Sequence, residues 1–464
     1  MIERLAIIGA SGDLTARFLL PALASLHQAG ELSQQFQLVA ASRDDWDDAT
    51  FRRWAADQLD LHAPELGPAA KEAVVASARY HQVDVTNADS MRPLIAGGEP
   101  VAAYLALPPS VFPPAVASLH AAGMPPGSTI VLEKPFGESL EEAIELNLLL
   151  ASLLPEEAVF RVDHFLAMST VQNVLGTRLA NRVLEPIWNS SHIAEIEIVW
   201  DETLGLEGRA GYYDGVGALK DMIQNHLLQL LCLVAMEPPI SLDQRGLRDR
   251  KVDVLRSIRP LDEADVLRTR RGRYTAGTTR GHAVPSYVDE EGVDPARGTE
   301  TFAEIQLAID NWRWPDTVFR LRTGKALSRD RMEVAVHFRD VPHLPFLRDR
   351  EVQPNVLRFG LEPENVSLEL TGVGSKAGAL SPLILVAQLQ PGRLPAYGRL
   401  LLDVLNRDAA LSIRGDEAEE SWRVVEPVID AWSKDLVPIQ DYRAGSNGPL
   451  GLVDRAMHVQ ARGA

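Results

Sequence analysis

In the first 165 residues, short apolar runs of strand length alternate with longer amphipathic stretches of helical period. Gly, Pro, Asp or Ser bounds each apolar run, as is typical of strands. Strict alternation of strand and helix is typical of βαβ units, whose parallel sheet is covered by helices on both faces. We therefore predict a doubly wound, Rossmann-like α/β domain with strands at 4–9, 37–41, 79–83, 101–107 and 129–133, and helices at 16–28, 48–59, 88–95, 114–122 and 139–153.

The pattern changes after residue 165. Alternating segments rich in β-branched residues follow one another without regular helices between them, at 193–200, 301–309, 332–338 and 366–370. Such an order predicts a mostly antiparallel sheet in a large β+α domain. One long helix is predicted at 215–236, and loops at 272–298 and 445–451. The sequence thus predicts two domains, 1–165 and 166–464.

Composition and charge narrow the function classes. The chain has 464 residues, 46% hydrophobic and 24% charged, which is ordinary globular composition. Its formal charge of −18 argues against a nucleic-acid partner, which needs a basic surface, but leaves room for an anionic small molecule. The single cysteine, Cys232, excludes a disulfide framework and a thiolate metal cluster within one chain. Apolar runs reach only about ten residues, short of the ~20 that span a bilayer. We expect a cytoplasmic protein with no metal, no membrane segment and no signal peptide.

The first predicted strand ends in a glycine-containing turn that opens a helix. One glycine there allows a tight turn, and a second lets the backbone approach a pyrophosphate over the helix N-terminus. The alternative is that these are glycines of an ordinary turn. The predicted cofactor contacts in this loop are Gly9, Ser11, Gly12, Asp13 and Leu14.

The second predicted strand ends in Ser42 and Arg43, where NAD enzymes usually place an acid for the ribose 2′-hydroxyl. A guanidinium at this position suits the 2′-phosphate of NADP, because it can form paired charge-assisted hydrogen bonds. Asp44 and Asp45 follow directly and could instead face a ribose. We expect NADP as the cofactor, with NAD use as the alternative.

Three further segments carry candidate catalytic residues. Lys134 follows the fifth strand, where ligands bind in open sheets, although it could be a solvated loop charge; its peptide bond to Pro135 could be cis. Asp163 could likewise belong to a charged loop. His226 lies in the long helix, where a histidine is often structural. In an α-helix Asp221 would lie about 140° round from His226, so a carboxylate that orients the imidazole should come from elsewhere, with Asp163 as the candidate.

Several motifs in order along the chain resemble those of the glucose-6-phosphate dehydrogenase family. They cover nearly the whole length and several are almost verbatim. The motifs lie at 9–14, 104–109, 133–137, 161–164, 211–214, 221–229, 311–314, 322–325, 420–422 and 442–449.

The resemblance implies a coenzyme domain and a mostly antiparallel domain that binds sugar and assembles into homodimers or homotetramers. It implies that His226 is the general base for the C1 hydroxyl and that Asp163 stabilises the imidazolium, as an aspartate does in a triad. Lys134 would contact both sugar and cofactor. The remaining implied sugar-binding residues are His164 at the substrate phosphate and Glu202, Asp221 and Lys325 at the hydroxyls.

The chain departs from the family where the substrate phosphate binds. The family stretch His-Tyr-Leu-Gly-Lys-Glu is replaced by 164–169, in which Phe165 and Met168 stand for the tyrosine and the lysine. Phe18 occupies a position that is commonly basic, and Asp330 another, with Arg329 and Arg331 as possible substitutes. We therefore expect a C1 dehydrogenase for an aldohexose that lacks the 6-phosphate or is modified at C6. The alternatives are an ordinary glucose-6-phosphate dehydrogenase and a silent NADP-binding paralogue.

Overall fold

The computed structural model describes residues 1–343, 354–373, 380–389 and 392–449. These residues form two compact units. Unit 1 comprises Met1–Gln172, Glu237–Val252 and Pro391–Trp422, and unit 2 comprises Asn173–Met236, Asp253–Gln390 and Arg423–Ala464. Two later segments of the chain therefore join the N-terminal one in unit 1. The two-domain division at residue 165 stays a prediction.

Unit 1 contains a six-stranded parallel sheet in the order β3-β2-β1-β4-β5-β6. The sequence predicted a parallel sheet and five of its strands, but neither β6 nor the strand order. This order is that of a dinucleotide-binding fold, in which the direction of winding reverses between β1 and β4. The apolar runs are strands because both faces of the sheet are covered, which leaves almost every strand residue buried. The strands are β1 (Arg4–Ile8), β2 (Gln37–Ser42), β3 (Ala78–Gln82), β4 (Val101–Leu105), β5 (Thr129–Glu133) and β6 (Val159–Val162).

The helices of unit 1 follow the predicted amphipathic stretches closely. The first differs in type, because a π-helical turn, η1 (Thr15–Leu19), precedes α1 (Leu20–Ala29). Helix α3 (Pro68–Ser77) was not predicted. Further along the chain, α12 (Ala396–Asn406) packs against α1 and against the short helix η4 (His164–Ala167). The other helices are α2 (Asp48–His62), α4 (Ala88–Ile95), η2 (Pro109–Val111), α5 (Phe112–Ala122), α6 (Leu140–Leu153) and η3 (Glu156–Ala158).

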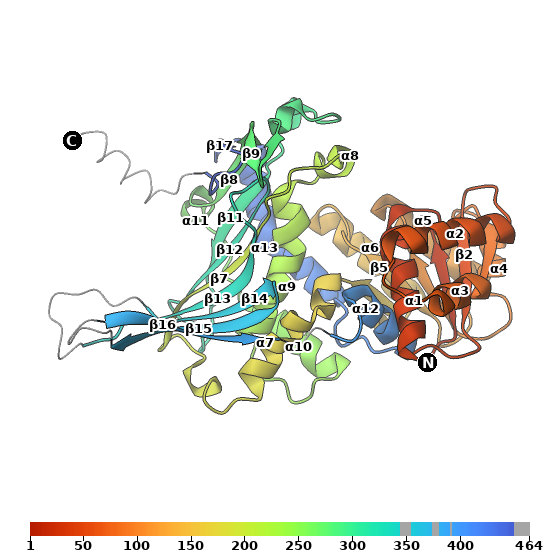
Figure 1. Cartoon of the computed structure of the whole chain (residues 1–464), viewed down its shortest axis with the longest axis horizontal. Helices are drawn as coiled ribbons and strands as arrows, with labels where there is room; N and C mark the ends of the chain where they lie inside the picture. The colour runs from red at the N-terminus through yellow and green to blue at the C-terminus, as the bar shows by residue number, and fades with distance from the viewer. Residues whose placement is uncertain (344–353, 374–379, 390–391, 450–464) are drawn as a thin grey trace. The chain divides into compact units, whose positions relative to one another are not determined.

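Unit 2 is built on a nine-stranded sheet in the order β16-β15-β14-β13-β7-β12-β11-β8-β17 (Figure 1). The sheet is mostly antiparallel, as predicted, but β12 runs parallel to β7 and β17 runs parallel to β8. Its strands are β7 (Ile193–Asp201), β8 (Arg270–Thr275), β11 (Phe302–Leu307), β12 (Val318–Gly324), β13 (Arg331–Phe338), β14 (Val356–Glu362), β15 (Asn365–Val373), β16 (Leu380–Gln388) and β17 (Gln440–Arg443).

The segment predicted as a loop at 272–298 contains short strands and helical turns. It contains the end of β8, a hairpin of β9 (Gly277–Thr279) and β10 (His282–Val284), and two single turns, η7 (Tyr287–Asp289) and η8 (Pro295–Arg297). Of the other predicted loop, residues 450 and 451 lie outside the described residues.

The long helix predicted at 215–236 is two segments, η6 (Leu219–Leu227) and α9 (Leu228–Ala235). Helix η6 lies against β7, β11 and β12. The remaining helices are α8 (Ala210–Tyr213), α11 (Glu263–Leu267) and η5 (Glu185–Ile187), with α7 (Ser169–Leu179), α10 (Gln244–Ser257) and α13 (Gly415–Ser433) crossing the unit boundaries. In the described part of the chain, no helix combines the length and hydropathy needed to cross a membrane.

Candidate active site

The glycine-containing loop lies at the carboxyl end of β1, beside the point where the winding of the sheet reverses. Gly9 has a φ of +95°, and a Cβ added there would lie 2.1 Å from the carbonyl oxygen of Ala106. Only glycine fits this close approach of two backbones. The Gly9 and Ala10 N–H groups donate to the Ala41 carbonyl at 2.8 and 2.9 Å, which fixes the loop to the end of β2. The loop therefore has the geometry that a dinucleotide pyrophosphate requires.

The end of β2 carries both a cation and a carboxylate beside this loop. The Ser42 hydroxyl donates to Asp44 Oδ2 at 2.8 Å and lies 2.6 Å from the Tyr80 hydroxyl. Hydrogen bonds from Ser11 and Ser42 hold the pKa of Asp44 below its usual range. Ser11 belongs to the phosphate loop, so Asp44 faces the loop. Arg43 is exposed next to it. These residues fit a dinucleotide whose ribose lies at the end of β2.

Lys134 follows β5 at the same carboxyl edge of the sheet, and its peptide bond to Pro135 is cis. The preceding residue, Glu133, was part of the recognised motif but had no predicted role. Its carboxylate accepts hydrogen bonds from the hydroxyls of Tyr104 and Tyr397. Burial raises the pKa of Glu133 to about 7, with the nearby Asp163 carboxylate acting in the same direction.

Asp163 and His164 follow β6, the next strand. Asp163 is 3% exposed, and its carboxylate accepts the Phe165 N–H at 3.0 Å to cap η4. The ring of His164 stacks on that of Tyr397, with centroids 5.3 Å apart and planes 16° apart. Phe165 is buried and packs edge-on against His164 at 4.9 Å. Unit 1 thus brings Lys134, Asp163 and His164 to one edge of the sheet, as parallel strands require.

In unit 2, two of the predicted sugar-binding residues form an ion pair. Glu202 and Lys325 follow the parallel neighbours β7 and β12, whose last residues Asp201 and Gly324 are in register. Lys325 Nζ donates to Glu202 Oε2 at 2.7 Å and lies 5.3 Å from the centre of the Tyr213 ring. The pair presents an acceptor and a donor together, as recognition of adjacent sugar hydroxyls requires.

His226 lies on η6, which is a π-helix rather than the α-helix that the sequence predicted. A π-helix closes its hydrogen bonds from i to i+5, so residues five apart are roughly one turn apart. Asp221 and His226 are five apart, and the predicted separation of about 140° between them is therefore wrong. His226 is 2% exposed, and Asp221 accepts a hydrogen bond from the Tyr212 hydroxyl at 3.2 Å.

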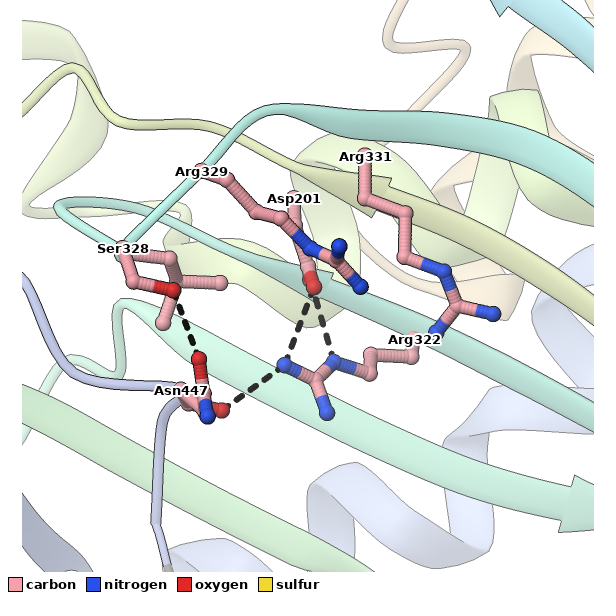
Figure 2. Close-up of a pocket in the computed structure, with 7 residues that line it drawn as sticks. Asp201, Arg322, Ser328, Arg329, Arg331 and Asn447 are labelled. Atoms are coloured by element: carbon pink, nitrogen blue, oxygen red, sulfur yellow. Dashed lines mark hydrogen bonds and ion pairs between the residues drawn. The ribbon is translucent and has the colours of Figure 1, made fainter.

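Asp330 stands at a position that is commonly basic in the family, and its neighbours Arg329 and Arg331 were considered as substitutes at the substrate phosphate. Asp330 pairs with Arg280 and accepts the Thr203 N–H at 2.7 Å. Arg329 and Arg331 line a separate pocket of about 440 Å³, in which Figure 2 shows them around the Arg322–Asp201 pair. The lining of that pocket includes neither Glu202 nor Lys325. Among the described residues of unit 2, Arg331 instead pairs with Glu197 and Glu333.

The predicted residues divide between the two units. Unit 1 holds the phosphate loop, Ser42, Arg43, Lys134, Asp163 and His164, and unit 2 holds Glu202, Asp221, His226 and Lys325. Sequence reasoning missed Tyr397, because a tyrosine in an amphipathic helix carries no signal of chemistry. Tyr104 lies in a recognised motif, and its proximity to Glu133 follows from the register of β4 and β5.

Two family descriptions together match nearly the whole chain. Residues 6–173 match the family description "Glucose-6-phosphate dehydrogenase, NAD binding domain", and residues 175–461 match "Glucose-6-phosphate dehydrogenase, C-terminal domain". The chain is 40% identical to glucose-6-phosphate 1-dehydrogenase of Treponema pallidum, over 97% of this chain and 92% of the relative. It is 37% identical to that of Zymomonas mobilis, over 98% of both chains.

Two solved structures are similar to this chain over nearly its whole length. A glucose-6-phosphate dehydrogenase in complex with its substrate glucose-6-phosphate has a TM-score of 0.89 at 30% identity, covering 97% of this chain and 96% of that chain. A glucose-6-phosphate 1-dehydrogenase from Mycobacterium avium has a TM-score of 0.86 at 33% identity, covering 97% and 95%. The chain is thus an NADP-dependent oxidoreductase that acts on a sugar CH–OH group, and it belongs to the glucose-6-phosphate dehydrogenase family.

Proposed function

We propose that this protein oxidises glucose 6-phosphate at C1 to the lactone, with NADP as the hydride acceptor. The observation that carries the proposal is full-length similarity, at 37–40% identity, to relatives named glucose-6-phosphate 1-dehydrogenase. A solved neighbour bound to glucose-6-phosphate supports the same substrate. The expectation of a hexose without the 6-phosphate, drawn from Phe165 and Met168, gives way to this alternative. Loss of two donors is a local change, and it does not outweigh similarity along the whole chain.

The proposal assigns the cofactor to unit 1. When bound there, NADP would supply the hydride acceptor of the reaction. Gly9, Ser11, Gly12, Asp13 and Leu14 would hold its pyrophosphate through backbone N–H groups at the start of the helix. Ser42 and Arg43 would hold the ribose and its 2′-phosphate, and Lys134 would contact cofactor and sugar.

The proton of the reaction is assigned to His226. As the C1–H electron pair leaves, the C1 hydroxyl must lose its proton, and a neutral imidazole within hydrogen-bond reach can take it. Burial of His226 supports a fixed position for that base. The role of Asp163 as the carboxylate that stabilises the imidazolium stays a proposal from the family resemblance.

The sugar hydroxyls are assigned to Glu202, Lys325 and Asp221, and the phosphate to His164. The ion pair between Glu202 and Lys325 supports this assignment, because each side chain keeps the other in place while leaving capacity for hydroxyl groups. His164 keeps the histidine of the family stretch, although two of its usual companions are replaced. A homodimer or homotetramer in the cytoplasm stays part of the proposal.

The direct test follows NADPH formation by absorbance with glucose 6-phosphate and, separately, with free glucose, mannose and galactose. The proposal requires the highest kcat/KM for glucose 6-phosphate. A free hexose that exceeds it would restore the modified-substrate hypothesis. Absence of turnover with every sugar, together with NADP binding, would favour the silent paralogue.

A further inference from the structure

One tyrosine in unit 1, Tyr397, contacts both His164 and Glu133, the residue before Lys134. Tyr397 is at the second position of α12, which packs against the short helix η4 that begins with His164. Its ring stacks on His164, with centroids 5.3 Å and planes 16° apart, and lies 5.1 Å from the Phe18 ring. The histidine ring thus has an aromatic face that defines its plane. Stacked aromatic pairs of this kind stabilise each other beyond the burial of their surface.

The hydroxyl end of the same side chain reaches Glu133. Tyr397 and Tyr104 both donate hydrogen bonds to the Glu133 carboxylate, one from α12 and the other from the fully buried strand β4. The charged groups that face this carboxylate are Lys134 on its own segment and Asp163 after β6. Glu133 immediately precedes Lys134, so fixing its carboxylate also fixes the start of the turn that carries the lysine.

We propose that Tyr397 is a positioning residue that sets the plane of the His164 ring by stacking and the place of Lys134 through Glu133. The inference rests on the proposed function, because it is the sugar phosphate that His164 and Lys134 would contact. Phe165 fills the site of the missing tyrosine, but it is buried with no hydroxyl. Tyr397 therefore orients His164, the residue of that stretch that the family resemblance places at the substrate phosphate. The role proposed for Tyr397 acts through these two neighbours.

The two contacts of Tyr397 can be separated by substitution. Tyr397→Phe keeps the ring over His164 and removes only the hydroxyl, whereas Tyr397→Leu removes both. Tyr104→Phe is the matched control, because it removes the other donor to Glu133 and leaves His164 untouched. Thermal unfolding of all three variants reports any general loss of structure.

The expected results differ between variants. Tyr397→Leu should raise KM for glucose 6-phosphate about three- to tenfold with a smaller change in KM for NADP, the range for loss of one stacked aromatic pair. Tyr397→Phe keeps the stack on His164, so it should raise the sugar KM less than Tyr397→Leu does, and the rise that remains reports the contact through Glu133 to Lys134. Both phenylalanine variants should move the acidic limb of the pH–activity profile to higher pH, since an ionised Glu133 loses a donor.

Equal sugar KM values for Tyr397→Leu and wild type would overturn the inference, as would a Tyr397→Phe variant that is as impaired as Tyr397→Leu. Wild-type turnover of glucose 6-phosphate tests the proposed function separately. A further readout needs no turnover: the ring proton signals of His164, in histidine-labelled protein, should shift in Tyr397→Leu and stay in Tyr397→Phe. The His164→Gln variant assigns those signals. Unchanged signals in the leucine variant would also count against the stack.

Discussion

Cofactor choice should depend on two adjacent side chains of opposite charge at the end of β2. Arg43 is exposed and free to approach a 2′-phosphate, while hydrogen bonds from Ser11 and Ser42 hold Asp44 ionised at the phosphate loop. The guanidinium favours NADP because it pairs with the phosphate dianion. The carboxylate disfavours NADP by repulsion and suits the free ribose hydroxyls of NAD. Removing each side chain in turn should therefore move the preference in opposite directions.

The size of the expected changes in cofactor affinity follows from the solvent exposure of Arg43 and Asp44. A hydrogen bond to a charged group is worth about 1.5–3 kcal/mol, and an exposed arginine belongs at the lower end of that range. Arg43→Ala should thus weaken NADP by about tenfold and leave NAD nearly unchanged. Repulsion between Asp44 and the phosphate at a few ångströms in a watery site is about 1 kcal/mol, so Asp44→Asn should strengthen NADP by about fivefold. Asparagine keeps an acceptor for the two serine hydroxyls.

The assay compares kcat/KM for NADP and for NAD at saturating sugar phosphate, together with direct cofactor binding. Asp45→Asn is the matched control, because it removes the same charge from the next, exposed position. The selectivity changes should shrink at high salt, since exposed charges are screened within about 10 Å at 0.1 M. Equal losses of NADP and NAD in Arg43→Ala would refute the contact with the 2′-phosphate. An Asp45→Asn effect as large as that of Asp44→Asn would show a general field instead of a local repulsion.

Three other predictions concern the base, the phosphate site and stability. His226→Asn should lower kcat by about 10²–10⁴ with NADP binding near normal, and undiminished turnover would remove its role as base. Phe165→Tyr with Met168→Lys should lower KM for glucose 6-phosphate. The gain in binding free energy should be at most about 3–6 kcal/mol, the range for two polar contacts to a charged group. An unchanged KM would place the phosphate away from these side chains. Burial raises the pKa of Glu300 from its usual 4.5 to about 7, so its contribution to stability is full below pH 4.5 and is lost as pH rises through 7. Melting curves of Glu300→Gln should therefore show a smaller loss of Tm between about pH 5 and about pH 8 than those of the wild type, and parallel curves would contradict the assignment.

Much of unit 1 could be predicted because its pattern is local. The apolar run that becomes β5 ends at Glu133 in both prediction and structure, and α4 has the bounds that its amphipathic period indicated. Burial on both faces makes such strands continuously apolar, and βαβ order then fixes a parallel sheet. The same order places the glycine loop, Lys134 and Asp163 at one edge of the sheet. The sequence alone therefore predicts that these residues lie together.

The parallel pairing of β7 with β12 in the second sheet could not be predicted from the sequence. The segment of β7 was predicted as an alternating strand, whereas that of β12 (Val318–Gly324) was not predicted as a strand. Nothing in either pattern says that the two are neighbours or that they run in the same direction. Pairing of distant strands depends on the chain closing long loops, which a local period does not encode. The ion pair of Glu202 and Lys325 at their ends therefore needed the tertiary structure, although the family resemblance had implied a sugar-binding role for each residue.

The sequence by itself determined the dinucleotide-binding sheet, its phosphate loop and the family, because these depend on local period and ordered motifs. Only the tertiary structure decided that the helix of His226 is a π-helix, which places Asp221 one turn away. Only it placed Tyr397, from a late segment of the chain, against His164 and Glu133. The physical reason is common to both: helix type and long-range packing are set by the surface on which a segment rests, and the hydrophobic pattern of the segment is compatible with more than one outcome.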